Sequence, residues 1–118
     1  MGVERRVMPR AFIRTAVRVE TTRGIQRYQS FNLSAGGIYL ETDKPLPVGS
    51  QIDLKFDLPG AGAVQAKGVV KHHQTLLIDE KGSGQSELHG MGISFLRIEG
   101  DGAQALAEQV KQLTLHTR

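Results

Sequence analysis

Apolar and polar residues alternate along most of the chain, which is the pattern of β-strands that bury one face. Residues 51–58 show it most clearly, because Ile52, Leu54, Phe56 and Leu58 occupy one face and charged residues lie between them. Similar alternation predicts further strands over residues 11–20, 25–31, 37–42, 63–74 and 92–98. The pattern therefore indicates a mainly β protein with six short strands.

The pattern changes near the C-terminus, where apolar residues recur every three or four positions. The residues concerned are Ala103, Leu106, Ala107, Val110 and Leu113. Asp101 is placed to cap the N-terminus of such a helix. We therefore predict a helix over residues 102–115 that closes one end, or covers the open side, of a six-stranded antiparallel β-barrel formed by residues 11–98.

Turn-forming residues separate the predicted strands. Residues 22–24 favour a turn, and residues 44–50 favour a connecting loop because their two prolines lack backbone donors. Gly68 predicts a bulge or bend within its strand. Residues 79–87, DEKGSGQSE, are polar and rich in glycine, so we expect a mobile loop there.

The composition limits the kinds of protein that the chain can form. A length of 118 residues suits a single domain over residues 1–118, large enough to bury a core without staples. The chain has no cysteine, which excludes disulfides and thiolate metal sites and fits a reducing compartment. No apolar run approaches the length of a membrane span, and no signal-peptide pattern follows the basic start. We therefore expect a soluble, cytoplasmic protein.

The positive charge of the chain is concentrated at its N-terminus. The formal net charge is +3, yet residues 1–18 hold five arginines against one acidic residue, and the remainder holds ten basic and eleven acidic residues. The five are Arg5, Arg6, Arg10, Arg14 and Arg18. The planar fork of arginine suits phosphate oxygens and guanine edges. For this segment alone, a solvated basic tail remains the alternative interpretation.

A second candidate site is the segment 31–42, FNLSAGGIYLET. Asn32 and Ser34 have side chains that bond readily to nearby backbone groups, which favours a turn. Gly36 and Gly37 permit positive φ angles and the close approach of a ligand or a backbone. Alternation resumes after the glycines, so the turn leads directly into a strand and can present its polar side chains to a ligand.

These two segments together resemble a known family. Arg6 and Arg10 form an RxxxR pair, and about twenty residues later Asn32, Ser34 and Gly37 form NxSxxG. Residues 90–95, GMGISF, look like a further signature of the same family. In this order and on this strand pattern, the motifs resemble the PilZ domain, a bacterial receptor for cyclic di-GMP, over nearly the whole chain. The resemblance implies the barrel with its C-terminal helix, and a second-messenger signalling protein of motility or exopolysaccharide regulation that is not an enzyme.

The resemblance also implies roles for individual residues. Arg6 and Arg10 would wrap the guanines and phosphates of cyclic di-GMP. Asn32 would bind a guanine edge, and Ser34 would contact phosphate or order the turn. These roles agree with the chemistry of the side chains, since guanidinium forks suit an anionic bis-phosphate and an amide oxygen suits a base donor.

Three further positions follow from the resemblance. Gly37, beside Gly36 in the same ligand-binding segment, would keep the surface open. Arg5 occupies the position found in members that hold two stacked ligand molecules, which implies two nucleotides per chain. Many members carry a tryptophan late in the strand expected at residues 63–74, but this chain has no tryptophan, and Lys71 and His72 lie there. We expect no cofactor besides the cyclic di-GMP ligand.

Residues 1–10 are expected to form a flexible tail that folds over the ligand. The segment has few apolar side chains, several mutually repelling arginines and no periodic pattern, so alone it cannot offset its ordering entropy. A bis-phosphate ligand would neutralise the arginines and order the tail. The changed surface would then signal to a protein effector that the sequence does not identify.

Other chemistry has weaker support in the sequence. His72 and His73 are adjacent, so a strand would point them to opposite faces, and no other histidine lies at ligand spacing. Ser34 is not in a GxSxG elbow, and Asp53 and Asp57 have the pattern of surface charges, so we expect no enzyme. Two alternatives to a receptor stay open: a PilZ-like scaffold that binds protein without nucleotide, and a small barrel that binds single-stranded nucleic acid.

Overall fold

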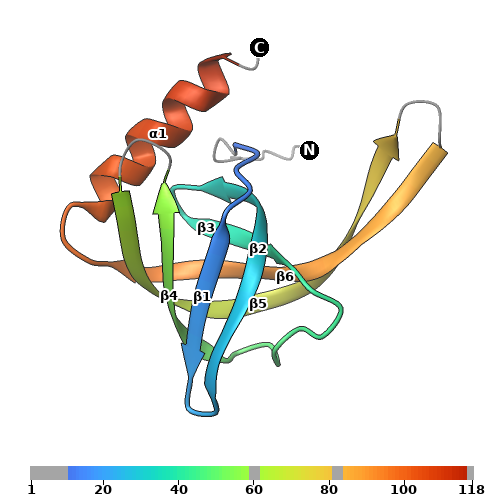
Figure 1. Cartoon of the computed structure of the whole chain (residues 1–118), viewed down its shortest axis with the longest axis horizontal. Helices are drawn as coiled ribbons and strands as arrows, with labels where there is room; N and C mark the ends of the chain where they lie inside the picture. The colour runs from blue at the N-terminus through green and yellow to red at the C-terminus, as the bar shows by residue number, and fades with distance from the viewer. Residues whose placement is uncertain (1–10, 59–61, 81–83, 117–118) are drawn as a thin grey trace, which may run out of the picture.

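The computed structural model describes residues 11–58, 62–80 and 84–116. The elements of this part are shown in Figure 1: β1 (Ala16–Thr21), β2 (Gly24–Ser34), β3 (Gly37–Glu41), β4 (Gln51–Leu58), β5 (Gly62–Glu80), β6 (Gly84–Ile98) and α1 (Gly102–His116). The predicted strand over residues 51–58 coincides with β4, and the predicted helix differs from α1 by one residue. The predicted tail, residues 1–10, lies outside the described residues.

The six strands hydrogen-bond to one another in a closed ring, in the order β1-β2-β3-β6-β5-β4, and every neighbouring pair is antiparallel. The prediction of six antiparallel strands followed by a helix is therefore confirmed. Within each half of the chain, strands that are neighbours in sequence pair with each other: β1 with β2, β2 with β3, β4 with β5 and β5 with β6. The two halves are joined by the pairing of β3 with β6 and of β1 with β4. This pairing brings residues 90–94 beside residues 37–41.

The interior of the ring is filled by the alternating apolar residues of its strands. On β4, the four even-numbered side chains are buried and the four odd-numbered ones are exposed, as the sequence predicts. The most deeply buried side chains are Val17, Val19, Leu33, Ile38, Leu40, Leu58, Val64, Val70, Met91 and Leu106. The core therefore joins all six strands and the helix.

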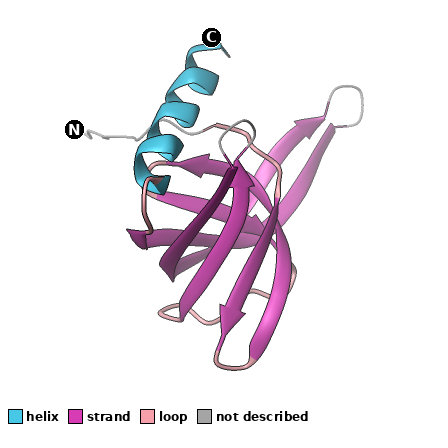
Figure 2. Cartoon of the chain, turned by 60° about the vertical axis from the view of Figure 1, so that its left-hand side comes forward, coloured by secondary structure: helices cyan, strands magenta, loops and turns pink. Residues whose placement is uncertain are grey.

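The helix α1 lies over one end of the ring, where it contacts β2 and β5 (Figures 1 and 2). It buries Leu106 and Val110 against the core, and its opposite face stays exposed. The Asp101 carbonyl accepts the first helical bond, from the Ala105 N–H, at 3.1 Å. Asp101 therefore occupies the predicted N-cap position.

The first predicted strand is shorter than expected, because β1 begins at Ala16 and residues 12–15 are not part of it. Ala11 instead forms a single antiparallel bridge to Leu33, with backbone bonds of 2.8 and 2.9 Å. Between bridge and strand, the buried Ser30 hydroxyl accepts from the Thr15 N–H and donates to the Ile13 carbonyl. These two side-chain bonds, with one backbone bond from the Ser30 N–H to the Thr15 carbonyl, take the place of a regular strand ladder here.

The loop predicted over residues 79–87 is wrong for residues 79–80 and 84–87, since β5 continues to Glu80 and β6 starts at Gly84. Residues 81–83 lie outside the described residues. Residues 74–80 and 84–89 form a two-stranded extension, here called the arm, that leaves the ring (Figure 1). Cross-strand pairs such as Leu76 with Leu88 continue the ladder outward. Residues 79–80 and 84–87 are strands because they pair with each other and with their neighbours in this ladder, although their polar, glycine-rich composition is typical of a loop.

The ladder between β5 and β6 shifts register at two places. One shift lies between Lys67 and Gly68, which confirms the predicted irregularity at Gly68. The second lies between Val70 and His72, so Lys71 is the extra residue of a bulge. Bulges increase the local twist and re-aim side chains. This one lies where β5 leaves the ring and becomes the arm.

Candidate functional site

A pocket of about 760 Å³ opens between the turn that joins β2 to β3 and the inner end of the arm. Its wall combines polar and apolar side chains with several glycines. The lining residues are Asn32, Ser34, Gly36, Gly37, Ile38, Tyr39, Lys71, His72, Gln74, Leu76, Gly92, Ile93 and Ser94. Four strands, β2, β3, β5 and β6, therefore contribute to one site.

The β2–β3 turn is held by the side chain of Ser34. Its buried hydroxyl accepts from the Gly36 N–H at 3.2 Å and lies 3.4 Å from the Gly37 carbonyl, to which it donates. A register shift between Ser30 and Asn32 precedes the turn and makes Phe31 the extra residue of a bulge. The predicted Asx/Ser turn is thus present, and Ser34 orders it.

Gly37 is required by packing rather than by an unusual backbone angle, since neither Gly36 nor Gly37 has a positive φ. A Cβ atom on Gly37 would lie 2.2 Å from the Ile93 carbonyl oxygen. Only glycine therefore lets β3 and β6 approach this closely. The predicted positive φ is absent, whereas the predicted close approach is present and involves the backbone of β6.

Tyr39 connects the pocket to the arm. Its hydroxyl donates to the Gln74 carbonyl at 2.6 Å and lies 3.2 Å from the Leu88 carbonyl, on the two strands of the arm. Burial raises the pKa of Tyr39 above its ordinary value, and the nearby Glu41 carboxylate adds to the effect. A protonated hydroxyl is what these two carbonyl acceptors require, so the pocket floor and the arm form one hydrogen-bonded unit.

The far wall of the pocket comes from the bulged part of β5. Lys71 and His72 both line it, and the His72 Nε2 atom lies 3.0 Å from the Gln74 Oε1 atom. The His72 ring lies against Gly92, where an added Cβ would come within 2.6 Å of Nε2. Gly92 therefore makes room for the ring. Among the described residues, Lys71 is the one lysine or arginine that lines the pocket.

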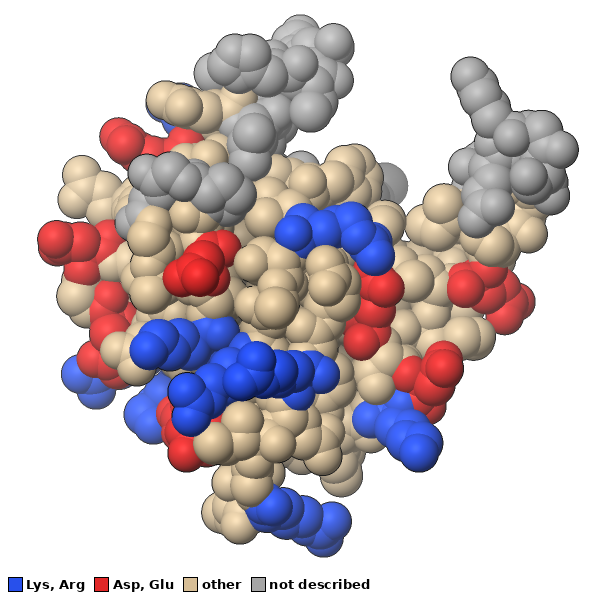
Figure 3. Space-filling model, in the orientation of Figure 1, with Lys and Arg blue, Asp and Glu red and all other residues tan. Residues whose placement is uncertain are grey.

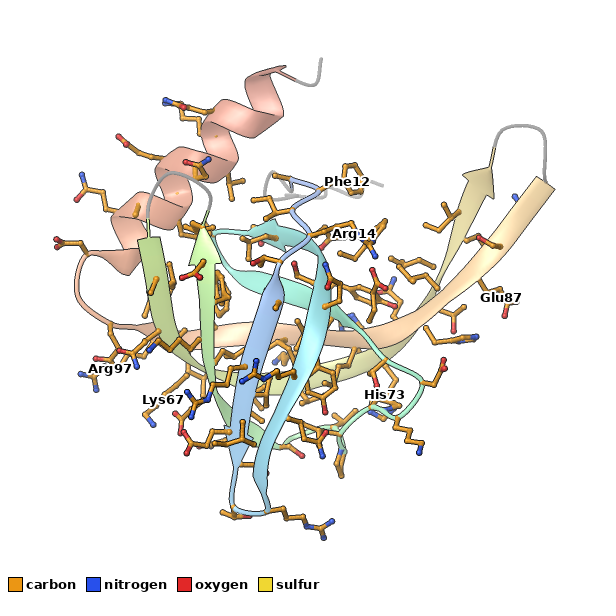
Figure 4. All side chains as sticks on the ribbon, viewed as in Figure 1. Phe12, Arg14, Lys67, His73, Glu87 and Arg97 are labelled. Carbon is orange, nitrogen blue, oxygen red and sulfur yellow. The ribbon has the colours of Figure 1, made fainter. Side chains whose placement is uncertain are left out.

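Aromatic side chains continue the site toward the start of the described chain. The ring of Phe31 packs edge-on against Phe12 at 5.4 Å and against Tyr39 at 6.3 Å. Arg14 lies 5.9 Å above Phe31 and forms a 2.6 Å ion pair with Glu41. Figure 4 shows Phe12 and Arg14 on the side of β1 and β2 toward the arm. Arg14 is thereby committed to Glu41, although the sequence groups it with the N-terminal arginines.

The structure brings together part of the predicted site. The pocket is lined by four of the predicted residues, Asn32, Ser34, Gly36 and Gly37. Residues that bind one ligand have to lie together in this way. The predicted Arg5, Arg6 and Arg10 lie outside the described residues. The residue after Arg10, Ala11, is bridged to Leu33, between the two polar residues of the turn. Ala11, the first described residue after the arginine segment, therefore lies beside the turn that lines the pocket.

Several lining residues were not predicted as ligand-binding. Tyr39, Gln74, Leu76 and Ser94 lie on strands whose pairing partners come from distant parts of the chain, so local patterns do not place them at the site. Lys71 and His72 were noted in the sequence as the pair that stands where many family members carry tryptophan, and His72 was also considered as a metal ligand, but neither was predicted to bind the nucleotide. The small Gly92 in a strand is the local signal that indicates a close neighbour.

Charged residues elsewhere are arranged as a mixed surface. Figure 3 shows basic side chains over β1 and β2 with acidic ones beside them. The strand register places Arg18 opposite Arg27 and Lys55, and the next exposed row holds Glu20 opposite Asp53. Such alternation differs from the basic groove with stacked aromatics that single-stranded nucleic acid requires.

The other candidate chemistry was examined in the described part of the chain. Asp53 forms a 2.7 Å ion pair with Lys67 on the exposed surface, as expected for a surface charge. His73 points to the opposite face from His72, with its Nε2 atom 2.7 Å from the Leu46 carbonyl. No three histidine or acidic side chains of the described residues gather as metal ligands. Among those residues, no helix has the length and apolar character needed to cross a membrane.

Comparison with known proteins agrees with this fold. The model of the PilZ domain family matches residues 4–112 of the chain. No curated protein matches it. Among solved structures, the Bacillus subtilis inhibitor of motility MotI/DgrA is similar with a TM-score of 0.75 and 21% identity, over 98% of this chain and 54% of that one.

Two further structures extend the comparison. The PilZ domain of YcgR from Escherichia coli, solved with c-di-GMP, has a TM-score of 0.73 and 13% identity, over 98% of this chain and 95% of that one. The K. pneumonia MrkH–c-di-GMP complex has a TM-score of 0.76 and 21% identity, over 98% of this chain and 54% of that one. The chain thus spans about half the length of MotI and MrkH. At these identities, the likeness shows a shared fold.

Proposed function

The chain belongs to the PilZ domain family, and from this premise we propose that it is a receptor for cyclic di-GMP. The observation that carries the proposal is the convergence of the NxSxxG residues on one pocket. Asn32, Ser34 and Gly37 line it, and Ala11, which follows the RxxxR segment, is bridged to Leu33 at its edge. This arrangement supports the proposal that the two motifs, although separated in sequence, contribute to a single site.

The chemistry of the site suits an anionic dinucleotide. Arg6 and Arg10 would supply guanidinium forks for phosphates and guanine edges, with Arg5 as a third cation. The half-buried Asn32 offers amide groups that match a guanine edge. Lys71 adds an exposed ammonium on the far wall, opposite the turn. The pocket would thereby contact the ligand from both sides.

The proposed output is a change of surface and involves no catalysis. Ligand contact would fix the N-terminal arginine segment against the pocket, and Tyr39 links the pocket floor to the arm through two carbonyls. A protein effector would then bind the altered surface. Motility and exopolysaccharide synthesis are the processes in which we expect it to act, with the protein in the cytoplasm.

Titration calorimetry tests this proposal. We expect heat with cyclic di-GMP and none with GTP or single-stranded RNA at the same concentrations. The chain should take up two nucleotides, because Arg5 offsets the charge of a second molecule, and Arg5→Leu should move the ratio toward one. Absence of heat with the dinucleotide at high protein concentration would overturn the receptor and favour a scaffold that binds protein alone. Binding of RNA would favour the nucleic-acid alternative.

A further inference from the structure

The arm carries an open β-strand edge. On the side of β5 away from β6, pairing with β4 ends at Val69, and the last backbone bonds are those of Val70 to residues 49 and 50. Beyond Val70, the described residues provide no backbone partner on that side. Exposed edges are templates for pairing with another strand, and proteins commonly blunt them with proline or lysine. The β5 residues 74–80, QTLLIDE, contain neither.

The register shows which backbone groups face this edge. The His89 carbonyl accepts from the Thr42 N–H at 2.9 Å, so the backbone groups of His89 point toward β3 and away from β5. Antiparallel ladders alternate, so Leu88 bonds to its partner Leu76, and the residues on either side of Leu76 point outward. The N–H and C=O groups of Thr75, Leu77 and Asp79 therefore face the open edge.

The side chains of this segment suit burial against another strand. Leu77 is 64% exposed, although leucine is usually buried. Leu76 and Ile78, on the opposite face, are only partly buried. A two-stranded ribbon is marginally stable in water without further packing. In the isolated chain, the arm therefore lacks a pairing strand at its open edge and a packing partner for the exposed Leu77.

We propose that the arm is completed by a second copy of this chain, which pairs antiparallel with it along the β5 edge. The two-fold axis passes between the two Leu77 residues, which exchange both backbone bonds. Thr75 of each copy then pairs with Asp79 of the other, and the two arms form a four-stranded sheet. The contact is isologous, as expected for a two-fold dimer.

Self-complementarity is what favours a second copy as the occupant. In the proposed register, Leu77 lies opposite Leu77 of the other copy, and Leu76 lies opposite Ile78. On the β6 edge, a two-fold axis at Glu87 would place two carboxylates opposite each other, which disfavours the same arrangement there. At His89 that edge is also already bonded to Thr42. The β5 edge is therefore the one that pairs.

Thiol cross-linking tests the register. The chain has no cysteine, so Leu77→Cys introduces a single thiol. In the dimer, the two Cα atoms at this position lie about 5.5 Å apart, within reach of a short bis-methanethiosulfonate. Thr75→Cys is the matched control on the same face of the same strand, where the two thiols lie about 14 Å apart. We expect high yield of dimer from the first and several-fold less from the second, and equal yields would overturn the register.

Sedimentation equilibrium tests the association itself. The proposed contact pairs only residues 75–79 of each copy, which makes a small interface. We therefore expect a weak dimer, with a dissociation constant on the order of micromolar or weaker. Leu77→Asp should weaken it at least tenfold, because two carboxylates would face each other. Leu96→Asp, at a leucine of similar exposure (56%) on β6, should leave it unchanged. A wild-type chain that stays monomeric at about 1 mM would overturn the proposal and leave the edge to a strand of another protein.

Both measurements are independent of the proposed ligand. They use the full chain without nucleotide, and none of the four substitutions replaces a residue that lines the pocket. A receptor that fails to dimerise, and a dimer that fails to bind nucleotide, are therefore distinguishable results. Retention of the wild-type melting temperature by Leu77→Asp shows that loss of the dimer does not arise from unfolding.

Discussion

At the scale of single residues, two glycines in the pocket differ in what surrounds them. A Cβ on Gly37 would meet the Ile93 carbonyl oxygen at 2.2 Å, whereas a Cβ on Gly92 would meet the His72 ring at 2.6 Å. The backbone of a central strand cannot move without breaking its ladder, but an exposed imidazole can rotate away. Gly37→Ala should therefore lower the free energy of unfolding by about 2 kcal/mol or more, and Gly92→Ala by less than about 1 kcal/mol.

The same pair separates stability from binding. Because Gly92→Ala displaces His72 in the pocket wall, we expect weaker cyclic di-GMP binding with a nearly normal melting temperature. Urea denaturation and calorimetry on both variants measure the two effects. A Gly92→Ala chain that is as unstable as Gly37→Ala would contradict the distinction between a rigid backbone neighbour and a movable side chain.

Lys71 allows a test of the far wall of the pocket. Replacing it with alanine removes an exposed ammonium from the wall of the proposed ligand pocket. If an anionic ligand binds there, affinity should fall about 3- to 10-fold and depend less steeply on salt. Lys67→Ala is the matched control, since Lys67 lies on the same strand but pairs with Asp53 on the outer surface. Calorimetry at two salt concentrations gives both quantities. Equal losses from the two variants would exclude a specific role for Lys71.

The sequence predicts individual residues well where local chemistry determines them. Ser34 and its neighbouring glycines form a turn that depends on bonds within a few residues, and this turn is recognisable from its composition. Tyr39 and Gln74 meet only because two distant strands pair with β6, which no local pattern specifies. The need for glycine at position 37 was predicted in part. Close approach of a ligand or a backbone was expected there, but the sequence did not indicate that the backbone of β6 is the neighbour.

At the scale of elements, the error over residues 79–87 has a physical cause. Polar, glycine-rich residues usually mark loops, because they bury too little apolar surface to order themselves. Here the ladder from Leu76–Leu88 to Glu80–Gly84 pairs the backbone groups that lie between the two strands, without a buried face. The alternation that located β4 is absent from the arm, where Leu76, Leu77 and Ile78 follow one another. Each segment of the arm is therefore a strand because it pairs with the other segment, and its own sequence pattern does not predict this.

Tyr39 provides the test of how the arm is attached. Tyr39→Phe removes a hydroxyl that bonds to the Gln74 carbonyl, so the free energy of unfolding should fall by about 1 kcal/mol. Tyr28→Phe is the control, because the Tyr28 hydroxyl bonds to the exposed side chain of Gln26 and its loss should cost less. Urea denaturation near neutral pH measures both. A larger loss from Tyr28→Phe would contradict the role of Tyr39 as a link to the arm.

The pH dependence of stability gives a second test of the same contact. Burial and Glu41 raise the pKa of Tyr39 in the folded protein, so the native state holds this proton more tightly than the unfolded state does. The resulting stability is complete below the unfolded pKa of about 10 and is lost as the pH rises through the folded pKa. Tyr39→Phe should therefore reduce the alkaline loss, and part of it should remain because the pKa of Tyr28 is also raised. An unchanged alkaline loss in Tyr39→Phe would argue against this assignment.

At the scale of the whole molecule, the number and direction of the strands could be predicted, but their closure into a ring could only be expected from the fold class. Closure requires β3 to pair with β6 and β1 to pair with β4. In the β1–β4 pairs, more than 30 residues of chain separate the two partners. The separation of charge was predictable from sequence alone. Of the five N-terminal arginines, Arg14 is paired with Glu41 and Arg18 lies opposite Arg27 and Lys55 in the ring. Arg5, Arg6 and Arg10 stay the predicted ligand-binding residues.

The last prediction concerns how those arginines act on the whole chain. A bis-phosphate ligand would neutralise Arg6 and Arg10 and hold the segment that precedes Ala11, the residue bridged to Leu33. Charge-assisted hydrogen bonds contribute about 1.5–3 kcal/mol each, and 1.4 kcal/mol corresponds to one decade of affinity. Arg6→Ala or Arg10→Ala should therefore weaken binding at least tenfold. Asn32→Ala should cost less, because it removes neutral bonds from a surface that exists without ligand.

Amide hydrogen exchange on residues 3–12 tests the ordering directly. Addition of cyclic di-GMP should slow exchange in this segment, whereas the core of β4 should exchange equally slowly in both states and serves as the internal control. Added salt should reduce both the protection and the affinity, since the contacts are between charges. Equal protection of residues 3–12 with and without ligand would mean that the segment is either a fixed clamp or uninvolved. The signal to an effector would then have to pass through Tyr39 and the arm.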